Sequence, residues 1–155
     1  MFYDNTEYQF ALFHHENNQQ DLIHIGLIGD KNIGKSKLIK QFRLNQQNFH
    51  IKYHSIDLKY TNTHHLSIFP SIDCLLLVFN INNQISFDHL IDRCLPLIET
   101  SHSICSLIGI KNQDFRQISS QQVNQLIEKF KIDYYEITSK CNYEQILTDI
   151  LDKIT

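Results

Sequence analysis

The stretch Gly29-Asp30-Lys31-Asn32-Ile33-Gly34-Lys35-Ser36 fits the pattern G-x-x-x-x-G-K-[ST] at every specified position. In such a loop, successive backbone N–H groups and the following helix N-terminus form a nest for phosphate oxygens. The lysine of the pattern reaches the terminal phosphates, and the hydroxyl of its last residue can ligate Mg²⁺. We therefore predict that this loop binds phosphate, with Lys35 and Ser36 in those two roles.

The residues on either side of the loop have the periodicities that the pattern requires. Leu22–Ile28 is a mostly apolar run, which predicts a buried strand that leads into the loop. Leu38, Ile39 and Phe42 lie at helical spacing, which predicts a helix over Lys35–Leu44. Strand, loop and helix together are the expected context of a phosphate-binding loop. A glycine-containing turn that binds nothing is the alternative.

The rest of the chain alternates between strand and helix patterns. This alternation predicts an α/β fold, a doubly wound parallel sheet with helices on both faces and a ligand site at the carboxyl ends of the strands. Residues 1–20 are polar and irregular, and we expect them to form an extension of a single domain over 21–155. The expected strands are 51–57, 73–81, 103–110 and 133–137, and the expected helices are 86–98, 119–130 and 143–154.

Composition excludes several classes of protein. The chain has 155 residues, enough for one domain with a core. Its net charge of −3 gives no electrostatic case for a nucleic-acid partner or an anionic membrane surface. Its four cysteines form no C-x-x-C pair, and no signal peptide or C-terminal lipid-anchor cysteine is evident, so we expect a cytoplasmic protein. The nine histidines show no metal-ligand spacing.

Four blocks of sequence, in order, resemble a Ras- or Rab-like small GTPase. They are Leu27–Leu38, Leu75–Phe87, Gly109–Asp114, where that family reads guanine with N-K-x-D, and Tyr134–Lys140, where it has a final strand and loop. The resemblance implies a P-loop GTPase-type fold that binds a guanine nucleotide, GTP or GDP, together with Mg²⁺. It also implies protein partners, which the sequence does not identify.

The resemblance implies a set of binding residues but no catalytic residue. By resemblance, the whole loop would bind the phosphates, the segments after two of the expected strands would bind the base, and one hydroxyl and one carboxylate would bind the metal. The implied nucleotide-binding residues are Gly29, Asp30, Lys31, Asn32, Ile33, Gly34, Lys35, Ser36, Asn112, Asp114, Thr138, Ser139 and Lys140, and the implied Mg²⁺ ligands are Ser36 and Asp57.

The first departure from the family is a missing block. Asp57 lies only 21 positions after Ser36, an interval in which the family fits a helix, the first switch loop and two strands. We therefore expect that the switch-one threonine and the second strand of the family are absent. The strand at 51–57 would then be an open sheet edge, which Tyr8–Phe13 could cover as an added strand. A disordered tail is the alternative for those residues.

The remaining departures affect hydrolysis and base recognition. Tyr60 stands where the family's D-T-A-G-Q segment has glycine, and no glutamine follows to orient a water, so we expect slow or absent hydrolysis. Lys111 and Asn112 are swapped relative to N-K-x-D, and a lysine cannot accept a hydrogen bond, so guanine selectivity should be weaker. Phe49 is placed to pack against the base or to join the core.

Three functions remain open from the sequence. The first is a guanine-nucleotide-binding protein of Rab or Ras type with degraded hydrolysis and switching. The second is a pseudo-GTPase, in which the fold serves as a structural or protein-interaction module with little or no turnover. The third is another P-loop enzyme such as a nucleotide kinase, which we discount because the only arginines are Arg43, Arg93 and Arg116.

Overall fold

The computed structural model describes residues 22–58, 72–100 and 103–154. Within them the chain forms five strands and four helices. The strands are β1 (Ile23–Gly29), β2 (Ile51–Asp57), β3 (Cys74–Asn80), β4 (Ile104–Ile110) and β5 (Asp133–Ile137), and the helices are α2 (Lys35–Asn45), α3 (Gln84–Thr100), α4 (Ser120–Phe130) and α5 (Tyr143–Ile154). Each of these elements was expected from the sequence, with ends that differ by at most two residues.

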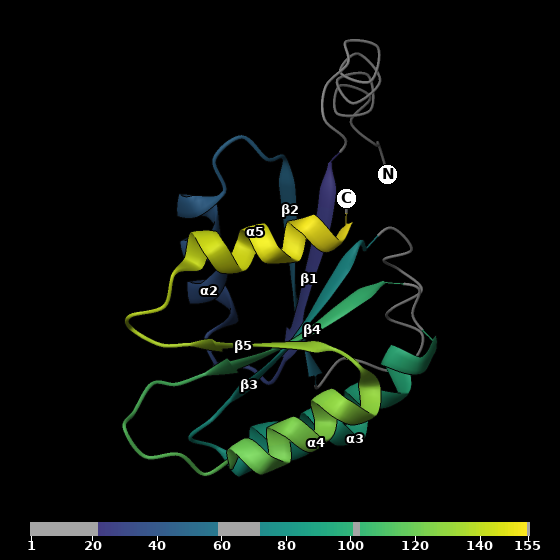
Figure 1. The fold of residues 1–155 in the computed structure, drawn as a ribbon, viewed down its shortest axis with the longest axis vertical. Helices are drawn as coiled ribbons and strands as arrows, with labels where there is room; N and C mark the ends of the chain where they lie inside the picture. The colour runs from purple at the N-terminus through teal and green to yellow at the C-terminus, as the bar shows by residue number, and fades with distance from the viewer. Residues whose placement is uncertain (1–21, 59–71, 101–102, 155) are drawn as a thin grey trace, which may run out of the picture.

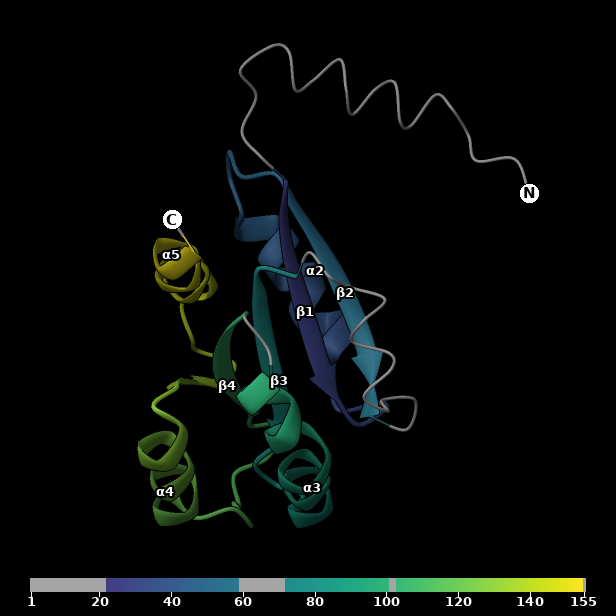
Figure 2. The same ribbon diagram turned by 90° about the vertical axis from the view of Figure 1, so that its right-hand side faces the viewer.

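The five strands form one parallel sheet in the order β2-β1-β3-β4-β5. Helices α2 and α5 lie on one face of this sheet, and α3 and α4 lie on the other (Figure 1, Figure 2). The predicted α/β class, with helices on both faces of a parallel sheet, is therefore confirmed. No helix in the described part of the chain is long and apolar enough to cross a membrane.

Each face of the sheet has its own apolar core. The core under α2 and α5 centres on Phe42, which is fully buried and packs against Tyr53 at a ring-centroid distance of 6.3 Å. The core under α3 and α4 centres on Phe79, which meets Phe87 edge to face at 4.9 Å. Both cores form because the central strands are covered on both faces, which explains the unbroken apolar run of β3.

Strand β2 is the last strand at one side of the described sheet. It pairs with β1 in parallel, and residues 46–50 connect it directly to α2. Among the described residues, therefore, no strand stands where the family's second strand would pair, as the short interval after Ser36 predicted. The expected covering strand, Tyr8–Phe13, lies outside the described residues.

The order of the strands places a crevice beside the loop. From β1 the chain passes through α2 to β2 on one side, whereas β3 and its successors lie on the other side. Ligands of such sheets bind where the strand order reverses, at the carboxyl ends of the strands. Gly29 ends β1 at this point and pairs in register with Asp57, the last residue of β2.

Glycine is required at position 29 because the loop passes close to the backbone of β3. A Cβ atom there would lie 2.3 Å from the carbonyl oxygen of Val78 and 2.6 Å from Cδ1 of Ile33. A strand carbonyl cannot move away without breaking sheet hydrogen bonds. At Gly26, on the same strand, the nearest atoms are methyl groups of Ile72 and Leu75 at 3.1 Å, which can shift.

We therefore predict that Gly29→Ala lowers the free energy of unfolding by about 2 kcal/mol, through overpacking against backbone. Gly26→Ala, the matched control, should cost less than about 1 kcal/mol because flexible side chains absorb the added methyl group. Urea unfolding followed by circular dichroism measures both. Equal losses at the two positions would contradict the role of the Val78 carbonyl.

Candidate functional site

The loop from Gly29 to Ser36 bends through two left-handed residues. Asn32 has a φ of 64° and Gly34 a φ of 113°, and α2 begins immediately afterwards at Lys35. Ile33 is buried and packs beneath the loop against Gly29, whereas Lys31 and Asn32 are exposed at its tip. The sequence thus folds into a turn whose exposed side borders the first turn of a helix.

The Lys35 ammonium joins three parts of the site. Its Nζ donates to the carbonyl oxygens of Gly29 at 2.6 Å and Asp30 at 2.8 Å, and to Oδ1 of Asp57 at 2.7 Å. The Lys35 side chain is only 4% exposed. A buried ammonium needs such partners because it has lost its hydration. The contact fixes the end of β2 to the loop, and it holds the cation where a phosphate would meet it.

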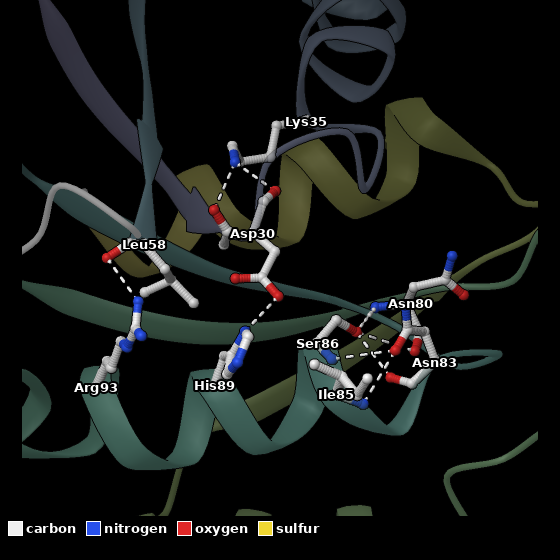
Figure 3. A network of polar contacts seen from close by, with 10 residues as sticks. Asp30, Lys35, Leu58, Asn80, Asn83, Ile85, Ser86, His89 and Arg93 are labelled. Atoms are coloured by element: carbon white, nitrogen blue, oxygen red, sulfur yellow. Dashed lines mark hydrogen bonds and ion pairs between the residues drawn. The ribbon is translucent and has the colours of Figure 1, made fainter.

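Helix α3 supports the loop from below. His89 Nδ1 lies 2.8 Å from Oδ2 of Asp30, and the Arg93 guanidinium donates to the carbonyl oxygen of Leu58 at 3.5 Å. Figure 3 shows both side chains reaching from α3 toward the ends of β1 and β2. The Asp30 side chain therefore points to α3, and its backbone carbonyl faces Lys35.

The two residues implied as Mg²⁺ ligands lie at the same edge of the sheet. Ser36 is exposed on the first turn of α2, directly after Lys35, and Asp57 is 29% exposed at the end of β2. A hydroxyl and a carboxylate suit Mg²⁺, which prefers oxygen ligands and keeps several waters. Asp57 would have to share its carboxylate between Lys35 and the ion. The donor set therefore fits the metal.

A cavity of about 180 Å³ lies next to the loop, between the start of α2 and the ends of β4 and β5. It brings together residues from the phosphate loop and from both segments that the resemblance assigned to the base. Its lining consists of Gly34, Lys37, Leu38, Ile110, Lys111, Asn112, Ile137, Thr138, Ser139 and Tyr143.

Two of the expected base-site residues are not part of this lining. Asp114 and Lys140 are both exposed, and neither borders the cavity. The Lys140 backbone N–H donates to Oγ1 of Thr138 at 3.2 Å, so this segment forms a tight turn at the cavity rim. Of the expected base residues, the structure places Asn112, Thr138 and Ser139 at the cavity.

The segment that carries Asp114 is held by a side chain from another loop. Asn82, which follows β3, accepts hydrogen bonds through Oδ1 from the backbone N–H groups of Asn112 at 3.0 Å and Gln113 at 3.2 Å. Its Nδ2 donates to the carbonyl oxygens of Gln113 and Phe115. One amide thus satisfies four backbone groups of residues 112–115.

Sequence reasoning did not identify several residues of the site, among them two polar supports of its loops and several residues that line the cavity. Asn82 and His89 support the site through hydrogen bonds to residues 30 or more positions away in the chain. A local sequence pattern does not predict such contacts. Lys37 and Tyr143 line the cavity only because α2 and α5 begin beside it. Partial burial raises the pKa of Tyr143, whose ring also meets Phe42 edge to face at 6.3 Å.

Other candidates from the sequence lie away from the cavity. Phe49 is 38% exposed and precedes β2, whose first residue pairs with the first residue of β1, at the end of the sheet opposite the loop. It does not line the cavity and is not one of the buried core residues. Among the described residues no group of three metal-ligating side chains occurs. Burial raises the pKa of the Cys74 and Cys94 thiols to about 12, so neither is a ready nucleophile.

The contact between Lys35 and Asp57 should also stabilise the fold. We predict that Asp57→Ala lowers the free energy of unfolding by about 3 kcal/mol, because the buried ammonium loses the one carboxylate that contacts it in the described part of the chain. In a Lys35→Met background the same change should cost less than about 1 kcal/mol. Urea unfolding of the four proteins measures the coupling.

Asp133 provides a matched control for that cycle. It pairs with Lys153 but is 60% exposed, so Asp133→Ala should cost less than about 1 kcal/mol. If Asp57→Ala costs no more than Asp133→Ala, the buried contact does not stabilise the fold.

Comparison with known proteins adds an independent line of evidence. The model of the Ras family matches residues 57–155, which begins after the phosphate loop and includes the cavity segments after β4 and β5. No curated protein is similar enough to the chain to count as a match. The loop motif and the family match thus rest on different residues, and the match covers more than half of the chain. The chain belongs to the Ras family of small GTPases.

Proposed function

We propose that this chain binds GTP and GDP at the Gly29–Ser36 loop, together with Mg²⁺, and hydrolyses GTP slowly or not at all. The observation that carries the proposal is the buried Lys35 ammonium at the switch point of the sheet, next to a cavity that the family's base-binding segments line. Gly34 borders the cavity and directly precedes Lys35, so one ligand with phosphates and a base could reach both the ammonium and the cavity.

The phosphate part of the proposal rests on charge and on backbone geometry. The left-handed bends at Asn32 and Gly34 turn the loop around the first turn of α2. The helix N-terminus carries partial positive charge, and Lys35 adds a full one. Ser36 and Asp57 would hold Mg²⁺, which when bound supplies further positive charge to the phosphate oxygens.

The hydrolytic part of the family's apparatus is reduced in this sequence. Tyr60 replaces the glycine of the second switch, no glutamine follows to orient water, and the first switch has no counterpart between Ser36 and Asp57. Tyr60 itself lies outside the described residues. Binding without efficient turnover is therefore the function we propose.

A pseudo-GTPase is the second candidate, with the fold serving as an interaction module of Rab or Ras type. One observation favours it: the Lys35 ammonium has three oxygen partners within the protein, and one of them is the Asp57 carboxylate. A phosphate must therefore compete with Asp57 or share the ammonium with it. A chain that has lost nucleotide binding could keep this closed arrangement.

The test of nucleotide binding is direct. The purified chain is denatured, and any released nucleotide is identified by chromatography and mass spectrometry. We expect GDP or GTP from the wild type and from the control Lys40→Ala, which removes an exposed charge from the same helix. Lys35→Ala and Ser36→Asn should release none. Wild type without nucleotide, even after incubation with GTP and Mg²⁺, would favour the pseudo-GTPase.

We further predict that GDP and GTP give nearly the same conformation. A switch needs contacts to the γ-phosphate that differ between states, and the sequence lacks most of them. Hydrogen–deuterium exchange of the two complexes should differ by less than their difference from the ligand-free chain. Strong protection that appears only with GTP, in residues 51–71, would show that a switch is retained.

A further inference from the structure

We propose that His89 on α3 is a positioning residue for phosphate binding, because it holds the Asp30 carboxylate away from the phosphates. This inference rests on the proposed function, since it concerns a ligand whose phosphates lie at the Gly29–Ser36 loop. It is carried by the contact between His89 and Asp30 and by the second contact that Asp30 makes, with Lys35.

Asp30 puts a negative charge into a loop whose other features favour an anion. It is the second residue of the loop, and its side chain is 24% exposed. The N-terminus of α2 and the Lys35 ammonium attract phosphate, whereas a nearby carboxylate repels it, more strongly the closer it lies. The direction in which the Asp30 side chain points therefore affects the affinity of the loop for phosphate.

Asp30 is held from two sides at once. Its carbonyl oxygen accepts a hydrogen bond from Nζ of Lys35 at 2.8 Å, and its Oδ2 lies 2.8 Å from Nδ1 of His89. Figure 3 shows the carboxylate turned toward α3 and away from the ammonium. An ionised carboxylate only accepts hydrogen bonds, so Nδ1 of His89 is the donor. The charge of Asp30 is thus satisfied by a group outside the loop.

Helix α3 fixes the position of His89 for this contact. Ser86, one turn earlier, is buried, and its hydroxyl accepts from the backbone N–H of Asn80 at 3.0 Å and donates to the carbonyl oxygen of Asn83 at 2.9 Å. Leu90, next to His89, is 1% exposed in the core under α3 and α4. Because these anchors hold the helix, the place of the imidazole determines where the carboxylate lies.

The experiment is a double-substitution cycle at positions 30 and 89. Nucleotide-free protein is titrated with GDP and Mg²⁺ by isothermal titration calorimetry. His89→Ala should weaken GDP binding by roughly fivefold, because the freed carboxylate can turn toward the phosphates. In an Asp30→Asn background the same change should weaken it by less than about twofold, since no charge is left to hold. Equal losses in the two backgrounds would overturn the inference.

Two further variants separate this role from a general effect on the fold. The amide of His89→Asn can donate from nearly the place of Nδ1, so this variant should bind GDP within about twofold of the wild type. His50→Ala is the matched control and should bind like the wild type, because His50 is exposed at the end of the sheet opposite the loop. A loss in His89→Asn as large as in His89→Ala would contradict the positioning role.

A spectroscopic measurement tests the contact without any nucleotide. Nitrogen-15 NMR of the imidazole shows which ring nitrogen carries a proton, and the hydrogen bonds of the ring determine this. We expect a protonated Nδ1 in His89 of the wild type and a loss of that preference in Asp30→Ala. An unprotonated Nδ1 in the wild type would overturn the inference.

The Lys35→Ala variant separates the two levels of the argument. If GDP does not bind the wild type, or if binding survives Lys35→Ala, the proposed function fails and this inference fails with it. If binding is lost in Lys35→Ala but unchanged in His89→Ala, this inference alone is wrong.

Discussion

The Lys35 ammonium is the contact on which the site depends. Its three acceptors come from the end of β1, from the loop and from the end of β2, which adjoin only because β1 and β2 are parallel and in register. A cation that is 4% exposed would be costly without them. The contact thus ties the edge strand β2 to the rest of the sheet at the point where a phosphate would bind. The same interaction therefore stabilises the edge of the sheet and positions the ammonium of the candidate site.

Much of the fold could be predicted because its signals are local. The apolar run of β3 and the helical spacing in α2 are visible in any window of ten residues, and the loop motif fixes the junction between β1 and α2. The supports of the site could not be predicted in this way. His89 contacts Asp30 across 59 positions, and Asn82 contacts Asn112 across 30. Such contacts form only once the strands have taken their order in the sheet. A local sequence pattern does not contain that order.

In the segments that the resemblance assigned to the base, the positions in the sequence could be predicted, but the exposure of the side chains could not. Counting from the motif places Asp114 where a guanine-reading carboxylate would be, but the exposure of a side chain depends on the path of its loop. That path is set here by Asn82, Ile81 and the end of β4, not by residues 111–114 themselves. Lys37, Ile110 and Tyr143, which motif reasoning passed over, border the cavity because three elements begin or end beside it.

The short connection between α2 and β2 bears on two properties that the family combines, which are binding of the phosphates and response to the γ-phosphate. Residues 46–50 lead directly from the helix into a strand parallel to β1, so the loop, Lys35 and Asp57 are positioned without any first switch. The groups that we propose hold the phosphates lie at the carboxyl ends of β1 and β2 and at the N-terminus of α2, and the structure contains all three elements. Contacts that sense a γ-phosphate come from segments between these elements, and the chain has no room for the first of them. We therefore propose that the absence of this block costs the chain its response to the γ-phosphate, whereas Lys35, Asp57 and the loop keep their places. This is the difference between binding and switching on which the proposed function rests.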